Sequence, residues 1–511
     1  MGQEIYIVRH GESEGNAGLP SQNHREIPLT EKGKTQAQEI PQHLPWEPEL
    51  IVISPFLRAR QTAQPTLDKY PDTAVEIWPE VREFTYLMPK KCTGTTTAQR
   101  RPWVEAYWSR LNPFYIDGEG AESFFELVYR ASETLRRIQN SSKQKILIFS
   151  HEQFIKVLTD LVERPLDTVD DRMERFNRLP RLGNCEGRLL QYDAGKLQNT
   201  RKERYTVKDI LDLTCCREIT NTFGGSGRKK KIIFNDRTYM VKFPVEANGD
   251  SPFSEDIACK IYKLLGYPAQ NTFLANYTTE RSGHRTVAAC EDFTEEGSSL
   301  LEFSKLCLAD GGHQRETRRE IKTIMGIIDR LPIADGHCHI DKESIKKQFL
   351  DMVVIDGFLG NPKRKLDDWG LLEDRDGNLA FAPLYDCASS LSASLTDEQM
   401  AKILSNEPEF TKRERNIHSF YDRLNFAELP ALAREKDFVL NDAICRITPK
   451  IERCLAVMFK IIDAAPRMSE IRKKYLQKSL QLRFDQILHP AFQAACSTSE
   501  KHKEKDYAQS K

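Results

Sequence analysis

Three short apolar runs constrain the fold of the first 200 residues more than any other feature. They are IYIV at 5–8, IVI at 51–53 and ILIF at 146–149. Continuous runs of this length, rich in branched side chains, are typical of strands buried on both faces of a parallel sheet. The segments 31–40 and 121–138 carry apolar residues at helical spacing and are predicted to cover such a sheet. The sequence therefore predicts an α/β unit.

Polar residues follow each of these runs directly. Arg9 and His10 follow the first run, Ser54 and Arg58 follow the second, and His151 follows the third. The carboxyl ends of parallel strands line one crevice, where ligands bind in open α/β sheets. We therefore expect these residues, far apart in the sequence, to converge on one pocket.

The residue types in this predicted pocket suit the chemistry of phosphate esters. A neutral imidazole can attack phosphorus and form a phosphorus–nitrogen bond that water cleaves readily, so His10 is the candidate nucleophile. Planar guanidinium groups bind phosphate oxygens in pairs, which is the role expected of Arg9 and Arg58. His151 is a further donor. These residues predict a phosphate-ester site.

An acid is needed to protonate the leaving oxygen. Glu83 is the candidate and Glu80 the second choice, because a carboxyl group in a partly buried cleft can hold its proton near neutrality. A solvated surface acid remains the alternative for Glu83.

With these residues in place, residues 3–195 resemble the histidine phosphatase superfamily, the phosphoglycerate-mutase-like enzymes. The matching pieces are IVRHGESEGN (7–16), PLTEKGKTQA (28–37), SPFLRARQTA (54–63), VREF (81–84), DGEGAESF (117–124) and IFSHEQFI (148–155). The resemblance implies a three-layer α/β/α fold and hydrolysis through a phosphohistidine intermediate. It implies His10, Glu83 and His151 as catalytic residues, Arg9, Arg58 and Asn16 as phosphate-binding residues, and neither metal nor cofactor.

Two departures from the family pattern bear on the reaction. Glu152 stands where the family usually has glycine, and we expect its carboxylate to point away from the pocket because it would repel phosphate. The tryptophan that the mutases carry shortly after RHGES is absent, which favours hydrolysis over mutase chemistry. The segment 87–115, rich in arginine and aromatic residues, is either a substrate lid or a packed helical insertion.

The chain is too long for one ordinary domain, since domains usually run to roughly 100–200 residues. The polar stretch 199–204 places a boundary near residue 203. We predict a first domain over 1–203, a second over 204–490 with a helical lobe from about residue 300, and a disordered polar tail over 491–511. The second domain begins with strand-like runs and ends in amphipathic helices, so an α+β fold is predicted.

The second domain carries a pattern suited to nucleotide binding. Gly225 and Gly227 precede a strand and could let backbone amides approach phosphates. Lys242 ends an apolar run, where a solvated charge would be out of place, and Glu255 on the following helix is its expected partner. This region, from residue 222 to about 395, resembles the HipA-like and CtkA-like serine/threonine kinases. The resemblance implies that Lys242 holds ATP phosphates, that Glu255 orients it, and that Asp386 binds magnesium.

The catalytic loop departs from that family. The family usually reads N-x-D-R-H-x-x-N-W-G, whereas this chain reads NPKRKLDDWG over 361–370. Lys363 replaces the catalytic aspartate, Lys365 the histidine and Asp368 the metal-binding asparagine, although Asp368 could still bind magnesium. A protonated lysine cannot accept a hydroxyl proton. A pseudokinase that binds nucleotide or a partner, an enzyme of altered chemistry and a structural relic all remain open.

The amino-acid composition bears on the class of partner and on the location of the protein. The 75 basic and 75 acidic side chains balance, so no global charge favours nucleic acid or a membrane as partner. The 12 cysteines form no CxxC pair, which favours a reducing, cytoplasmic location. We expect a phosphorylated small molecule or phosphoprotein as substrate, with ATP and Mg²⁺ in a second domain that regulates hydrolysis. The alternatives are an active kinase that uses Asp367 or Asp368 as base, and a non-catalytic scaffold.

Overall fold

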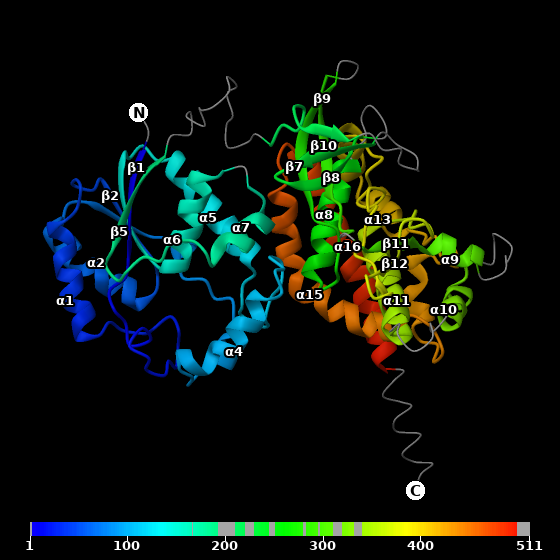
Figure 1. Cartoon of the computed structure of the whole chain (residues 1–511), viewed down its shortest axis with the longest axis horizontal. Helices are drawn as coiled ribbons and strands as arrows, with labels where there is room; N and C mark the ends of the chain where they lie inside the picture. Colours follow the sequence, from blue (N-terminus) through cyan, green and yellow to red (C-terminus); the bar gives the residue numbers. More distant parts are fainter. Residues whose placement is uncertain are drawn as a thin grey trace, which may run out of the picture. The chain divides into compact units, whose positions relative to one another are not determined.

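The chain divides into two compact units, Met1–Asp209 and Ile210–Lys511 (Figure 1). The structure is a computed structural model. It describes residues 3–165, 167–192, 210–219, 229–244, 251–279, 283–294, 297–309, 319–331 and 340–497. The predicted boundary near residue 203 lies outside the described residues.

A five-stranded sheet forms the centre of the first unit. Its order is β3 (Ala74–Ile77), β2 (Leu50–Ile53), β4 (Lys145–Ser150), β1 (Gln3–Arg9) and β5 (Gly187–Tyr192). The first four strands are parallel, and β5 pairs antiparallel with β1. The three apolar runs of the sequence are the three central strands, so their prediction is confirmed.

Helices cover both faces of this sheet. On one face, Val8, Ile51 and Phe149 pack with Ile40 and with α2 (Leu57–Lys69), which contacts α1 (Glu31–Glu39). On the other face, the alternate strand residues pack with α5 (Phe124–Gln139) and α6 (Glu152–Glu163). The three-layer α/β/α architecture is therefore confirmed. The remaining elements are η1 (Ile40–Gln42), η2 (Pro79–Val81), α3 (Pro89–Cys92), α4 (Thr97–Trp108) and α7 (Val169–Phe176).

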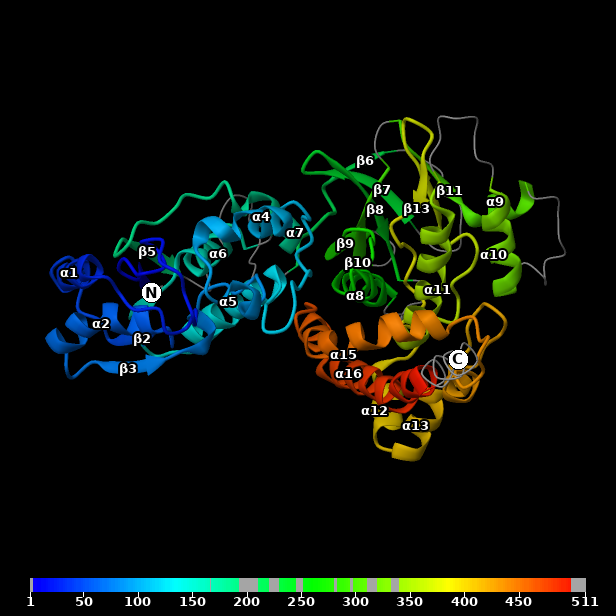
Figure 2. The same ribbon diagram turned by 90° about the horizontal axis from the view of Figure 1, so that it is seen from below.

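The second unit opens with an antiparallel sheet. Its order is β6 (Arg217–Ile219), β7 (Lys229–Phe234), β8 (Arg237–Lys242), β10 (Gly283–Glu291) and β9 (Thr272–Thr279), and α8 (Ser251–Leu264) packs on β9 and β10 (Figure 2). The turn between β7 and β8 has positive φ at Asn235 and Asp236, 48° and 61°. Both residue types tolerate that conformation, which suits them to this tight hairpin turn.

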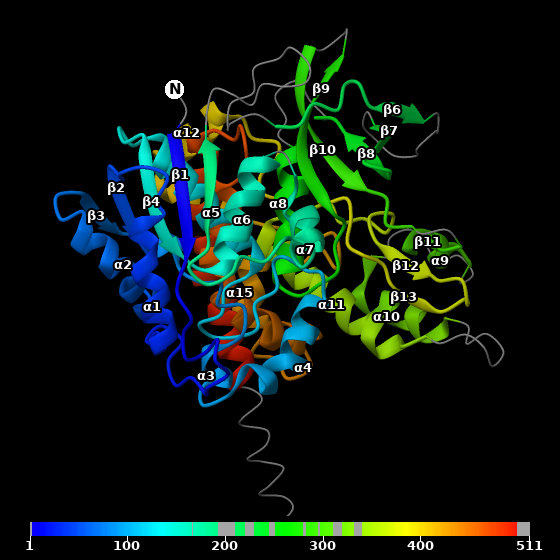
Figure 3. The ribbon, with the colours of Figure 1, turned by 60° about the vertical axis from the view of Figure 1, so that its left-hand side comes forward.

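The rest of the second unit is mainly helical. A small sheet of β11 (Ser299–Glu302), β12 (Gly370–Glu373) and β13 (Leu379–Phe381) lies near α9 (Phe303–Ala309) (Figure 3). The other helices are α10 (Ile321–Arg330), α11 (Lys342–Leu359), α12 (Asp397–Leu404), α13 (Glu407–Arg415), η4 (Phe426–Glu428), α14 (Leu429–Leu432), α15 (Asn441–Asp463), α16 (Glu470–Arg483) and η5 (Phe484–Leu488). The predicted α+β class with a helical C-terminal lobe is confirmed.

The polar tail begins later than the sequence predicts. Helical backbone continues through residue 497, and Ala491 and Ala495 are buried. Two alanines spaced four apart lie on one helical face, which explains how this short polar segment packs. Residues 498–511 lie outside the described part. Within that part, none of the helices combines the length and apolar character needed to cross a bilayer.

Two candidate functional sites

The imidazole of His10 lies at the carboxyl end of β1 and is almost fully buried. Its Nδ1 lies 2.7 Å from the carbonyl oxygen of Gly11, and its Nε2 accepts a hydrogen bond of 3.1 Å from Arg58 Nε. Because a carbonyl only accepts, this network assigns the ring proton to Nδ1. Burial, followed by the charge of Arg58, holds the pKa of His10 well below its usual range. The ring is therefore neutral, with a lone pair on Nε2.

Arg58 on α2 is buried beside this lone pair. Its Nη1 donates to the carbonyl oxygen of His24 at 2.8 Å, and its guanidinium lies 5.1 Å from the ring centre of Phe56. Burial lowers the pKa of Arg58 to about 10, although Glu83 opposes the shift. The guanidinium consequently keeps its charge at neutral pH and fixes the orientation of His10.

Arg9 pairs with a carboxylate, that of Glu152. Its Nη1 lies 3.1 Å from Glu152 Oε2 and also donates to the carbonyl oxygen of Leu182. Glu152 does not line the cavity around His10, as expected, but its carboxylate pairs with Arg9, a contact that the sequence does not predict. Lys156, at 3.7 Å, is a second cation on Glu152 and further balances its charge.

His151, at the carboxyl end of β4, is fully buried 5.1 Å from His10, measured between ring centres. Its Nε2 lies 2.7 Å from Ser54 Oγ. Its Nδ1 and the Nε of Arg9 are buried and have no hydrogen-bond partner among the described residues. Burial and the charge of Arg58 hold the pKa of His151 well below its usual range. A phosphate oxygen would accept a hydrogen bond from the Nε of Arg9, and from the Nδ1 of His151 in the tautomer that carries its proton there.

Glu83 follows η2 and faces the same pocket. Its Oε1 accepts a hydrogen bond of 2.9 Å from the backbone amide of Phe84. Burial raises the pKa of the Glu83 carboxyl, and the nearby Arg58 and Arg9 only partly oppose that shift. Glu80, the second candidate acid, instead lies 3.7 Å from Arg137 and does not line the pocket.

Two adjoining cavities receive these side chains. The smaller, of about 160 Å³, is lined by Arg9, His10, Ser13, Gly15, Asn16, Leu19, Ser21, Ile27, Arg58, Glu83, Thr97 and Arg100. The larger, of about 530 Å³, shares Arg58, Glu83 and Arg100 with it and extends to Phe56 and Tyr86. The structure thus brings Arg9, His10, Asn16, Arg58 and Glu83 together, and the ring of His151 lies tilted against that of His10 without lining either cavity.

The segment 87–115 contributes both to the cavities and to the packed core. Arg100 on α4 lines the two cavities and is anchored by Ser21 Oγ and Thr95 Oγ1. Tyr107, on the same helix, is buried in the core. Ser13 was missed as a lining residue, although it lies inside the RHGES motif and its Oγ donates to Asn16 Oδ1 at 3.0 Å.

The second candidate site is centred on Lys242, the last residue of β8. Its Nζ lies 2.8 Å from Glu255 Oε1 on α8 and 3.2 Å from Asp386 Oδ1. Burial disfavours the charge of Lys242, but Glu255, Cys290 and Asp386 together outweigh that effect and raise its pKa well above the usual range. Asp386 is held at a φ of 54°, a left-handed conformation that aspartate tolerates. The predicted lysine, glutamate and aspartate therefore lie together.

The loop over 361–370, which departs from the family pattern, contains a buried guanidinium, that of Arg364. Arg364, whose role the sequence does not indicate, pairs with Asp356 at 2.8 Å and donates to the carbonyl oxygen of Asp368 at 3.0 Å. Its only sequence signal was its match to the arginine of the family motif. Lys363 and Lys365 are exposed.

Asp368 and Asp386 were predicted to bind a metal. Burial, followed by the charge of Asp386, raises the pKa of Asp368 to about 6. The charge of Asp386 therefore disfavours ionisation of Asp368. No group of three or more histidine, cysteine or acidic side chains in the described ranges is arranged to hold a metal ion. Gly225 and Gly227 lie outside those ranges.

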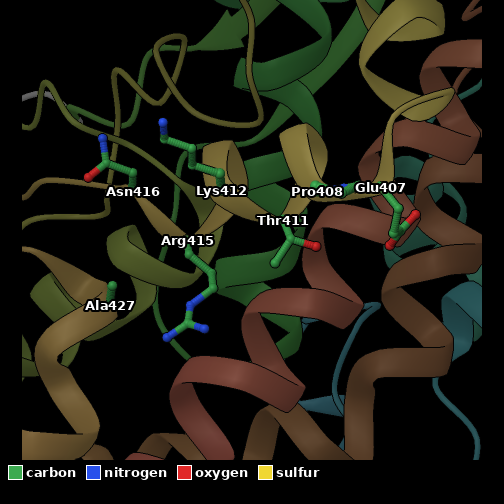
Figure 4. A pocket seen from close by; sticks show the side chains of 7 residues that line it. All are labelled: Glu407, Pro408, Thr411, Lys412, Arg415, Asn416 and Ala427. Carbon is green, nitrogen blue, oxygen red and sulfur yellow. The ribbon is translucent and has the colours of Figure 1, made fainter.

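A third, shallower depression lies on the helical lobe (Figure 4). Its volume is about 820 Å³, and it is lined by Glu407, Pro408, Thr411, Lys412, Arg415, Asn416 and Ala427. None of the predicted site residues lines it.

Comparison with known proteins identifies both units. Residues 5–201 match the model of the histidine phosphatase superfamily, branch 1. The adenosylcobalamin/alpha-ribazole phosphatase of Salmonella typhi is 33% identical over 163 residues, which cover 30% of this chain and 76% of that protein.

The serine/threonine-protein kinase CtkA of Helicobacter pylori is 31% identical over 314 residues, covering 58% of this chain and 91% of the kinase. Its crystal structure matches 56% of this chain and 98% of the kinase with a TM-score of 0.50. The first unit ends at Asp209, so an alignment of 314 residues must extend into the second unit. The chain therefore belongs to the histidine phosphatase superfamily through its N-terminal unit and to the CtkA-like kinases through its C-terminal unit.

Proposed function

We propose that the N-terminal unit hydrolyses phosphate monoesters and that His10 carries the phosphoryl group between the two halves of the reaction. The observation that carries this proposal is the state of His10. Its Nδ1 is tied to a backbone carbonyl and its Nε2 is unprotonated beside Arg58. A nucleophile needs such a lone pair, and the fixed ring needs no reorientation before attack.

The neighbouring groups supply the remaining requirements. Arg9 and Arg58 stabilise the charge that spreads over the phosphoryl oxygens during in-line transfer, with His151 as a further donor. Glu83, whose pKa burial raises, holds a proton for the leaving alcohol. In the second step the same carboxylate, now ionised, accepts a proton from the water that attacks phosphorus. The second step releases phosphate and restores neutral His10.

A panel of phosphate monoesters tests this function on the full chain. The panel includes alpha-ribazole phosphate, because a relative is named for that activity, together with sugar phosphates and phosphopeptides. We expect phosphate release from at least one member, and loss of that release in His10→Ala. Release of phosphate at the same rate by His10→Ala would contradict the proposal.

A second function is favoured by the contacts of Lys242. We propose that the C-terminal unit binds a nucleoside triphosphate and adjusts hydrolysis by the first unit, without itself transferring phosphate. Lys242, paired with buried Glu255, is the group that would contact the phosphates, and Asp386 with Asp368 would hold Mg²⁺. Exposed Lys363 stands where a kinase has its base, which supports binding without transfer.

Titration of the full chain with ATP tests this second proposal. We expect saturable binding that Lys242→Met removes, a change in the phosphatase rate on saturation, and no phosphate transfer to protein. Transfer that disappears in Asp386→Ala but persists in His10→Ala would instead identify an active kinase. A chain that neither binds ATP nor changes its phosphatase rate would exclude the regulatory role.

A further inference from the structure

Lys229, the first residue of β7, is the cross-strand partner of Lys242. Residues directly opposite each other on antiparallel strands project on the same face of the sheet. The next pair, Lys230 and Val241, projects on the other face, where Val241 is buried in the core with Ile232. Lys229 therefore shares the face on which Lys242 meets Glu255 and Asp386.

The charge of Lys229 acts on this site. Burial alone would raise the pKa of Asp386, but Lys242 and, next in size, Lys229 bring it below its usual range. Asp386 itself lies 3.2 Å from the Nζ of Lys242, on the face of the sheet that Lys229 shares. Lys229 is half-buried rather than extended into solvent.

The three successive lysines of β7 differ in their partners. Lys230 pairs with Glu218 and donates to the hydroxyl of Tyr277 at 3.0 Å, and Lys231 pairs with Asp292 at 3.1 Å. Within the described ranges, Lys229 makes no ion pair within 4 Å. Lys242 is already neutralised by fully buried Glu255, so Lys229 is the lysine on this face whose charge is least compensated.

We propose that Lys229 is a second phosphate-binding lysine, which acts with Lys242 to hold the polyphosphate of a nucleoside triphosphate. This inference rests on the nucleotide binding proposed above. A triphosphate brings several negative charges, and Lys242 alone cannot balance them because Glu255 shares its ammonium. A compact ammonium beside a phosphate chain forms charge-assisted hydrogen bonds, which are stronger than neutral ones. Lys229 supplies such a donor from the strand next to Lys242.

The test uses the full chain carrying His10→Ala, so that the phosphatase unit does not consume the ligand. Titration calorimetry measures binding of ATP, tripolyphosphate and adenosine, each with Mg²⁺ and with EDTA. Lys229→Met is compared with Lys229→Arg and with Lys230→Met, a matched loss of charge one residue away on the opposite face. The thermal unfolding midpoint of each variant checks that the fold is retained.

We expect Lys229→Met to weaken ATP binding by roughly tenfold, the size of one charge-assisted contact. Lys229→Arg should recover most of that affinity, and Lys230→Met should change it less than about twofold. The loss should be seen with tripolyphosphate as well as ATP, and ATP should bind more tightly than tripolyphosphate because the base adds contacts.

Three outcomes would separately contradict the role of Lys229, the class of ligand and the proposed nucleotide binding. If Lys229→Met binds ATP as the parent chain does while Lys242→Met does not, Lys229 is not a phosphate ligand. If tripolyphosphate binds as tightly as ATP, the ligand is a polyphosphate and not a nucleotide. If the parent chain does not bind ATP, or Lys242→Met binds it unchanged, the proposed nucleotide binding itself fails.

Discussion

The two sites of this chain differ in whether their buried residues are also the groups proposed to react. In the N-terminal unit, the buried His10 and Arg58 are themselves the groups proposed to act on phosphorus. In the C-terminal unit, Lys242 pairs with buried Glu255, but exposed Lys363 stands where the resemblance to the kinases implies a catalytic base. On the two proposals above, the second site would keep the contacts for a ligand but lack the group that reacts with it. The two units should therefore respond differently to substitution.

The largest expected effect is the loss of the nucleophile. His10→Ala should lower kcat/KM for phosphate monoesters by on the order of 10⁴-fold or more, since removal of a nucleophile abolishes the covalent route. His43→Ala removes an exposed histidine of the same unit and serves as the matched control. Steady-state kinetics measure kcat/KM of both variants. A similar loss of kcat/KM in both would contradict the proposed role of His10.

The second largest effect is expected from substitution of Glu83, the proposed acid. Glu83→Gln should lower kcat by about 10²-fold to 10³-fold for alkyl phosphates, and by much less for p-nitrophenyl phosphate, whose leaving group needs no proton. Because burial raises the pKa of Glu83, the protonated acid is present at lower pH and lost as pH rises through that pKa. The fall in rate on the alkaline side should therefore disappear in Glu83→Gln. A profile unchanged by the substitution would remove Glu83 from its role.

A smaller effect is expected on stability, from loss of the ion pair between Lys242 and Glu255 in the second unit. Lys242→Met leaves fully buried Glu255 without its partner, which should destabilise β8 and α8 by about 3 kcal/mol. Amide hydrogen exchange of the intact chain measures this locally. Lys242→Met combined with Glu255→Leu should recover part of the loss. No recovery would show that packing, and not the unpaired charge, accounts for the effect.

The sign of the pH dependence follows from the raised pKa of Lys242. A folded pKa above the unfolded value of about 10.4 means that the pair stabilises the fold fully below that value. The contribution is lost as pH rises through the still higher folded pKa. Local protection of β8 should therefore be unaffected by this group at neutral pH and decline only in strongly alkaline solution.

The smallest effect sharpens the role of Glu152. Its carboxylate lies 3.1 Å from Arg9 and competes with phosphate for that guanidinium. Glu152→Gln should lower the inhibition constant of inorganic phosphate by about twofold to threefold, the size of a partly exposed ion pair. Glu163→Gln, at the exposed end of the same helix, is the control. A higher inhibition constant in Glu152→Gln would mean that the carboxylate instead orients Arg9 for binding.

The sequence predicted the central strands well because burial on both faces requires continuous apolar runs, as in Ile51 to Ile53. It did not predict β3, whose four side chains are all exposed at the sheet edge and leave no such pattern. It also did not predict the ion pair of Glu152 with Arg9, since one motif position cannot show where a side chain turns. Arg364 was missed for a similar reason, because its role depends on a partner, Asp356, in another element.

The central claim is that hydrolysis by this chain passes through phosphorylated His10. Rapid acid-free quenching of the full chain, mixed with a ³²P-labelled monoester that it hydrolyses, tests this directly. The account predicts a label on protein that is stable to alkali, labile to acid, mapped to the peptide containing His10 and absent from His10→Ala. Hydrolysis without protein labelling, together with a His10→Ala variant that remains active, would contradict it.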